Sequence, residues 1–173
     1  VGQLRPFFEA ERQLAAGRPA DAARALTGGE SLVALRVPAA AQLARVVAAD
    51  ASLALPDRAA AAAVAGTPRE VFLLTGADKT PAVRALRALA HVELADATRA
   101  RAELTGILLD PATALARAAL GQLEQRADQR DAAIRTLLAS TPSPAALRWL
   151  SRLAPGALGP ELERAVLAAA ART

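Results

Sequence analysis

Apolar residues recur along the chain three and four positions apart, in stretches separated by regularly placed prolines and glycines. Proline suits the first turn of a helix, where its missing N–H is not needed, and is costly farther in. Prolines stand just before most of these stretches and glycines stand where several of them end. The pattern predicts short helices over 4–16, 19–27, 30–36, 38–50, 56–65, 68–75, 81–95, 97–109, 111–126, 128–140, 144–153 and 160–171.

Composition points to the same fold class. Alanine, which has the best helix propensity, fills 49 of the 173 positions, whereas the residues that favour strands are scattered. Most of the predicted linkers hold only about two to five residues, so successive helices must be antiparallel neighbours. We therefore expect an all-α fold of about ten to twelve short helices.

One segment of the chain recurs in part. "ALAHVELADATRARAELTGILLDP", residues 88–111, matches the residues 33 positions later: Ala88, Ala100 and Leu104 meet Gly121, Ala133 and Leu137. The N-terminal stretch "FFEAERQLAAGRPADAARAL" offers the same slots, which are Ala10, Gln13-Leu14, Gly17-Arg18, Ala22 and Leu26. A period in the low thirties built from two antiparallel helices is typical of a helical solenoid.

Residues 88–111 resemble a tetratricopeptide repeat, since they place Ala88, a turn at Ala95-Asp96, Ala100, Leu104, Leu108 and a closing Asp110-Pro111 in the order of that family. They depart from it in lacking one residue before Asp110 and in carrying Arg84 and His91 where the family has large aromatics. The resemblance covers units at about 4–27, 81–111 and 114–142, with irregular helices over 30–76 and a capping pair over 144–171. It implies one domain, 1–173, folded as a right-handed α-solenoid.

The resemblance also implies a concave groove that holds a partner's peptide or helix. Carried over residue by residue, the positions that face this groove are Phe7, Glu11, Ala85, Leu89, Val92, Glu93, Ala118, Gln122, Gln125 and Arg126. Members of the family that bind a chaperone's terminal carboxylate use several lysines and asparagines there. This chain offers only Arg126, so that particular activity is not expected.

The arrangement of charge gives no reason to expect nucleic-acid binding. The net charge is +4, and 20 of the 21 basic residues are arginine. These arginines are spread along the whole length, no block of five or six like charges occurs, and aromatics for base stacking are missing. The excess of arginine and alanine indicates a bacterial source with GC-rich codons.

No residue pattern indicates an enzyme or a cofactor site. Without cysteine the chain has no disulfide, thiol nucleophile or thiolate metal site. The single histidine, His91, lacks the further ligands that zinc needs, and Glu93 and Asp96 are not its helical neighbours. Glu103, on the next predicted helix, leaves a histidine–acid pair open, but we expect His91 to pack between helices.

Leucines at helical spacing are expected to fill the seams between the helices. The positions predicted to be most buried are Leu86, Leu89, Leu104, Leu108, Leu120, Ile134 and Leu137, and Leu104→Asp is expected to unfold the central pair. Small residues at Ala88, Ala100, Gly121 and Ala133 are expected to let helix backbones approach closely. Phe7 and Phe8 are adjacent, so they cannot both enter one seam.

These observations favour a non-catalytic protein-interaction module, without cofactor or metal, that takes part in a larger bacterial assembly. The alternative is a structural domain that associates with copies of itself. No apolar stretch is long enough to span a membrane. The start, "VGQLRPFFEAE", suggests a mature form or a fragment of a longer chain, and it leaves the envelope and the cytoplasm both open as locations.

Overall fold

The computed structural model describes residues 5–27, 38–110, 113–139, 160, 164 and 168. Within these residues every regular element is a helix and no strand occurs, which confirms the all-α prediction. The helix predicted at 30–36 and the pair predicted over 144–171 lie outside these residues, apart from the three isolated positions. The chain divides into two compact units, Val1–Asp78 and Lys79–Thr173, and each is described by itself.

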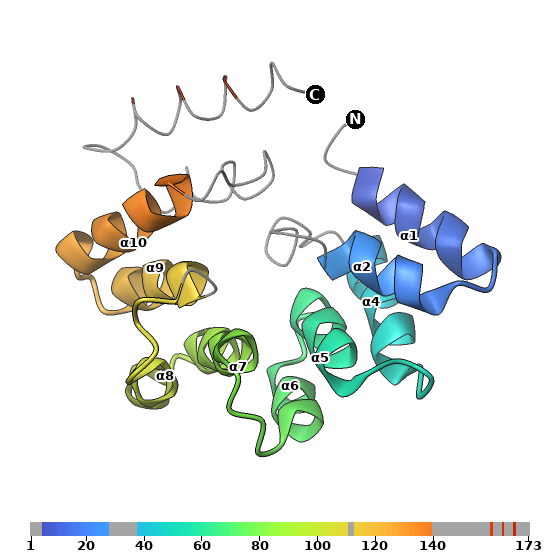
Figure 1. Ribbon diagram of the computed structural model, residues 1–173, viewed down its shortest axis with the longest axis horizontal. Coiled ribbons are helices and arrows are strands. Elements are labelled where there is room, and N and C mark those ends of the chain that lie inside the picture. Colours follow the sequence, from blue (N-terminus) through green and yellow to red (C-terminus); the bar gives the residue numbers. More distant parts are fainter. Residues whose placement is uncertain are drawn as a thin grey trace. The chain divides into compact units, whose positions relative to one another are not determined.

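The first unit contains hairpins of short helices. Its described helices are α1 (Arg5–Ala15), α2 (Pro19–Thr27), α4 (Pro38–Ala49), α5 (Leu55–Val64) and α6 (Pro68–Thr75). Their ends lie within one residue of the predicted ones. Helix α1 packs on α2, α4 on α5 and α5 on α6, while α2 also contacts α5 (Figure 1). Helices α5 and α6 form a hairpin within the described part of the interval 30–76.

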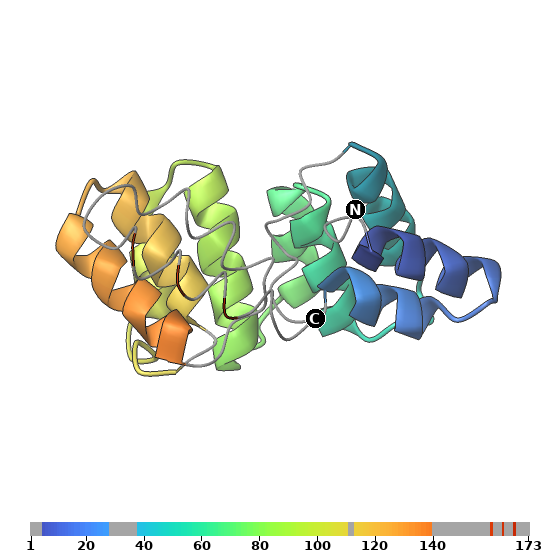
Figure 2. The ribbon, with the colours of Figure 1, turned by 90° about the horizontal axis from the view of Figure 1, so that it is seen from above.

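The second unit follows the same plan. Its described helices are α7 (Pro81–Glu93), α8 (Ala97–Leu104), α9 (Ala114–Leu123) and α10 (Ala127–Ala139). Helix α7 packs on both α8 and α9, and α9 packs closely on α10, which lies beside it in both views (Figure 1, Figure 2). Proline begins α7, as predicted, and Asp96 caps α8 by accepting a hydrogen bond from the backbone N–H of Arg99 at 3.0 Å.

The same turn closes four of the hairpins. Its central residue has a positive φ, and the next residue donates its backbone N–H to the carbonyl five positions earlier, as in a Schellman motif. Gly17 and Gly66 occupy this position in the first unit, and Ala95 and Gln125 occupy it in the second. The closing bonds are Arg18 to Gln13, Thr67 to Ala62, Asp96 to His91 and Arg126 to Gly121, at 2.8–3.1 Å. Each hairpin therefore reverses direction by one backbone mechanism.

These turns correct the predicted repeat length within the second unit. The turn residues Ala95 and Gln125 are 30 positions apart, whereas the 33-residue sequence match pairs Ala95 with Asp128. Helix α9 begins 33 residues after α7, but α9 has 10 residues and α7 has 13. The turn after α9 and the helix that follows it therefore lie three residues earlier than an offset of 33 predicts. Gly17 in the first unit and Ala95 in the second make the same type of turn.

Helix α8 is shorter than predicted. The stretch 97–109 was expected to be one helix, but α8 ends at Leu104 because Thr105 is extended and Gly106 has a φ of +80°. Leu108 and Leu109 therefore leave the helix and are 50 % and 96 % exposed, so the predicted burial of Leu108 is wrong. Helix α9 also starts later than predicted, at Ala114, after an N-cap position at Thr113.

Alanine supplies more than half of the buried apolar residues that the structure describes. Larger side chains fill the gaps that alanine leaves, and Leu104 and Ile134 are almost fully buried. The other predicted core positions Leu86, Leu120 and Leu137 are also buried, whereas Leu89 is only partly so. An alanine side chain buries little apolar surface. The few leucines and Ile134 therefore account for much of the apolar surface that is buried in the second unit.

Helices α9 and α10 approach each other very closely at Gly121. A Cβ atom on this residue would lie 2.8 Å from the backbone nitrogen of Arg130 and 3.0 Å from its Cα. The predicted close approach of backbones is confirmed at Gly121, and the facing residue is Arg130 of α10. Ala88, Ala100 and Ala133 are buried in the same unit.

Replacing Leu104 by alanine is expected to reduce the stability of the second unit by about 2–5 kcal/mol, because it empties a fully enclosed site. Hydrogen exchange of the peptides from α7 to α10, followed by mass spectrometry, measures the loss. The matched variant Leu109→Ala should change protection by less than about 0.5 kcal/mol, since its side chain lies in solvent. Equal effects of the two substitutions would contradict this description of the core.

Gln125→Gly is expected to stabilise the chain by about 0.5–1 kcal/mol, because glycine adopts the positive φ of this turn without steric cost and the Gln125 side chain is exposed. Urea unfolding followed by circular dichroism measures the change. Arg135→Gly, at an exposed position inside α10, is the control and should lose about 1 kcal/mol. A loss of stability in both variants would argue against strain at the turn.

Candidate functional site

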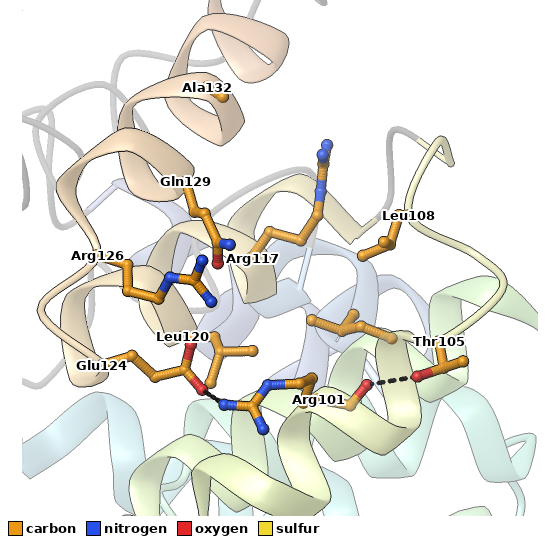
Figure 3. Close-up of a pocket in the computed structure, with 10 residues that line it drawn as sticks. Arg101, Thr105, Leu108, Arg117, Leu120, Glu124, Arg126, Gln129 and Ala132 are labelled. Atoms are coloured by element: carbon orange, nitrogen blue, oxygen red, sulfur yellow. Dashed lines mark hydrogen bonds and ion pairs between the residues drawn. The ribbon is translucent and has the colours of Figure 1, made fainter.

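A cleft of about 380 Å³ lies between α8, α9 and α10 in the second unit (Figure 3). Helix α8 contributes Arg101 and Leu104 at a spacing of three, which places them on one face. Helix α9 and its C-cap contribute Arg117, Leu120 and Glu124 along a second face. The cleft thus combines a leucine floor with charged groups from two helices.

The start of α10 forms the third wall. The turn at 124–126 brings Arg126 and Gln129 over the face of α9 that carries Leu120. The side-chain amide of Gln129, with its oxygen turned toward Arg126, accepts a hydrogen bond from Nη2 at 2.7 Å. Figure 3 shows these two side chains directed toward each other above the α9 helix. Arg126 is therefore held at the rim by a neutral partner.

Arg101 and Glu124 form an ion pair that ties α8 to the end of α9. The Glu124 side chain is only 9 % exposed, whereas that of Arg101 is 59 % exposed. Glu124 uses Oε1 in this pair, and its Oε2 is buried without a hydrogen-bond partner among the described residues. Such an atom costs free energy until a donor reaches it.

Arg117 is the most enclosed cation of the cleft. Its Nε is buried and has no hydrogen-bond partner in the described part of the chain. Burial lowers the pKa of the guanidinium, which remains charged at neutral pH because arginine titrates far above that range.

The floor of the cleft is apolar. Leu104 and Leu120 are buried, and Leu108 is half exposed at the edge, on the segment that follows α8. Three arginines and one carboxylate surround this floor, which leaves the lining with an excess of positive charge. The cleft can therefore hold a group that is anionic on one side and apolar on the other.

The residues predicted to face a groove fall into several environments. Phe7 and Glu11 belong to the first unit, where Phe7 is half buried, Glu11 is exposed, and the ring of Phe7 meets that of Phe8 edge-on at 5.4 Å between centroids. Phe8 is 55 % exposed, in line with the expectation that the two rings could not share a seam.

The remaining positions belong to the second unit. Leu89 and Val92 are half buried and pack against the core around Leu104, while Glu93, Gln122 and Gln125 are exposed. Gln122 accepts a hydrogen bond from Arg130 at 3.2 Å. Only Arg126 lines the cleft. Ala85 and Ala118 are buried, with 4 % and 0 % of their surface exposed, and neither lines the cleft.

Three cleft residues, Arg101, Arg117 and Glu124, were not predicted from the sequence. A signal for them does exist, because Arg101 lies three positions before the core residue Leu104, and Arg117 and Glu124 flank Leu120 at spacings of three and four. Polar residues that share a helix face with buried leucines border the core. That all three reach one cleft depends on how α8 packs on α9.

His91 lies in a different part of this unit and is partly buried. Burial is the main cause that lowers its pKa below the ordinary value of 6.5, and Asp96 and Glu103 oppose this shift while Arg99 and Arg87 add to it. The Glu103 carboxylate, the candidate partner for a histidine–acid pair, accepts two hydrogen bonds from Arg87 at 2.9 and 3.1 Å and also meets Arg84. The described residues contain no cluster of three or more histidine, cysteine or acidic side chains suited to a metal ion.

Comparisons of the chain with protein families, curated proteins and solved structures found no match. Within the described residues, no helix combines the length and the apolar character that crossing a bilayer requires.

Stability is expected to fall as pH drops below about 6.5, because the unfolded chain then takes up a proton at His91 that the folded chain resists. Above that pH both states hold neutral histidine and the effect vanishes. Urea unfolding at half-unit steps between pH 5 and 7.5 measures the slope. His91→Gln should flatten it, and an unchanged slope in the variant would show that another group titrates.

Proposed function

We propose that the chain is a non-catalytic protein-interaction module, and that the cleft between α8, α9 and α10 binds an anionic, partly apolar segment of a partner protein. The observation that carries the proposal is the pairing of a leucine floor with two cations, Arg117 and Arg126, that form no ion pair among the described residues. An acidic segment brings negative charge to Arg117 and Arg126. An apolar residue within the same segment packs against Leu108 and Leu120.

The helical architecture supports the same function. Short hairpins that each bury one face against the next leave an extended surface for a partner, as in α-solenoids. A right-handed tetratricopeptide-like superhelix remains our proposal for how the hairpins continue. The functional surface proposed here is nevertheless the α8–α10 cleft, in which Arg126 is the one member shared with the predicted groove.

Self-association is the second candidate. Leu108 and Leu109 are 50 % and 96 % exposed on the segment after α8, and a second copy could cover them. This alternative requires a mass that rises with protein concentration in light scattering. A constant monomer mass would favour binding to a different partner.

The test of the leading proposal uses a capped, fluorescent peptide of alternating aspartate and leucine, five residues long. It is offered to the full chain both in linear form and as a cross-linked helix of the same residues. At least one form should bind in an anisotropy titration, and Arg117→Glu or Arg126→Glu should weaken it about tenfold or more, because a charge-assisted hydrogen bond contributes roughly 1.5–3 kcal/mol.

Arg135→Glu is the matched control, since Arg135 is an exposed residue of α10 that does not line the cleft. It changes the net charge by the same amount and should alter the affinity by less than about threefold. Failure of both peptide forms to bind, or equal weakening by all three substitutions, would refute the proposed site.

A further inference from the structure

Helix α8 is much shorter than the helix with which it forms a hairpin. It holds 8 residues, whereas α7, which packs on it, holds 13. Beyond the end of α8, an open hollow of about 630 Å³ lies between Pro81, at the start of α7, and residues 106–110. The apolar spacing of the sequence nevertheless continues to Leu109. The hairpin is therefore incomplete beside the first turn of α7, although the sequence favours helix there.

Two local features keep residues 105–109 out of the helix. The first is a type II turn, closed by the N–H of Ile107, which donates to the carbonyl of Leu104 at 3.2 Å. Within it Thr105 has a φ of −60° and a ψ of 128°, and Gly106 has a φ of +80°. Type II turns favour glycine at their third position because other residues rarely adopt a positive φ. Gly106 thus stabilises the turn that ends α8.

The second feature is the side chain of Arg84, which reaches from α7 to the end of α8. Its Nη2 donates to the carbonyl of Thr105 at 2.9 Å and to that of Ala102 at 3.3 Å. In a continuous helix these two carbonyls would accept the N–H groups four positions later, which are those of Leu109 and Gly106. Arg84 therefore occupies both of the acceptors that the next turn of α8 needs.

The observed conformation leaves several groups of this segment in solvent. The backbone N–H groups of Gly106, Leu108 and Leu109 have no backbone acceptor among the described residues. Leu108 is also 50 % exposed. One more turn of α8 would pair all three N–H groups. It would also place Leu108 four positions after the buried Leu104, on the same face of the helix.

We propose that residues 105–109 form a strap that can close as an additional turn of α8, and that the turn at Gly106 and the side chain of Arg84 hold it open. Closure ends at the strap, because Pro111 disfavours helix at the residue before it. Closing covers Leu108 and changes the edge of the cleft, since Leu108 lines the cleft. This conformational change goes beyond the proposed function and does not depend on it.

Gly106→Ala in the full chain tests the strap. Alanine is better suited than glycine to a helix and disfavours the positive φ of the open turn, so the ratio of closed to open chains should rise by about tenfold or more. Amide hydrogen exchange measured by NMR should slow by about fivefold or more at Leu108 and Leu109, and the carbon shifts of 105–109 should become helical. Exchange within about twofold of the parent, with a loss of stability, would mean that alanine is merely strained in an open turn, and the proposal would be wrong.

Gly66→Ala is the matched control. Gly66 has a similar φ of +69° and, like Gly106, open space where a Cβ would lie. Helix α5 cannot extend past it, because Thr67 precedes Pro68 and such a residue disfavours helix. The unfolding constant should therefore rise by about fivefold or more, without slower exchange at the neighbouring amides. Slower exchange after Gly66 as well would show that the effect is not specific to the strap, and would contradict the proposal.

Arg84→Met tests the second restraint, because methionine fills similar space and donates no hydrogen bond. Glu103, which lies 3.7 Å from Arg84, keeps its two hydrogen bonds from Arg87 and so remains paired. With both carbonyls released, exchange at Leu109 should slow by about threefold or more, and further when Gly106→Ala is added. Unchanged or faster exchange would show that Arg84 only caps α8, and the proposed restraint would be wrong.

Discussion

The close packing of α9 against α10 is the constraint on which the second unit depends. Gly121 lies so near Arg130 that a single added carbon would meet the backbone at 2.8 Å, and the carbonyl of Gly121 also accepts the N–H of Arg126 that closes the turn. Both contacts fix where α10 begins. Because Arg126 directly precedes α10 and Gln129 lies in its first turn, the place of both cleft residues depends on this glycine.

A core rich in alanine has two effects on the molecule. Helices approach closely where alanine or glycine faces a neighbour, and the few larger side chains must then carry most of the apolar burial. Leu104 and Leu120 serve this purpose and also form the floor of the cleft. The same leucines therefore stabilise the helix packing and line the cleft, so a substitution in the floor changes the stability of the unit and the shape of the cleft at once.

The sequence predicts the helices well because their boundaries depend on local chemistry. Proline at Pro19, Pro68 and Pro81 starts a helix, and a glycine such as Gly66 ends one, whatever the rest of the chain does. The errors have two local causes. Helix α8 ends five residues early because Thr105 is extended and Gly106 has a positive φ. The turn after α9 lies at Gln125, which adopts a positive φ that its side chain does not favour, so its identity gives no signal of the turn.

The cleft could not be predicted for a related reason. Arg101 comes from α8, whereas Arg117 and Glu124 come from α9 and its C-cap. The early end of α8 at Leu104 places Leu108 at the edge of the space between these helices.

The residue types that line the cleft determine which chemical modifications can change its charge. Each cation that lines it is an arginine, and the one lysine of the chain is Lys79. Lysine acetyltransferases therefore have no target among the cations of the cleft. A modification that changes their charge has to act on guanidinium groups, as arginine deimination does.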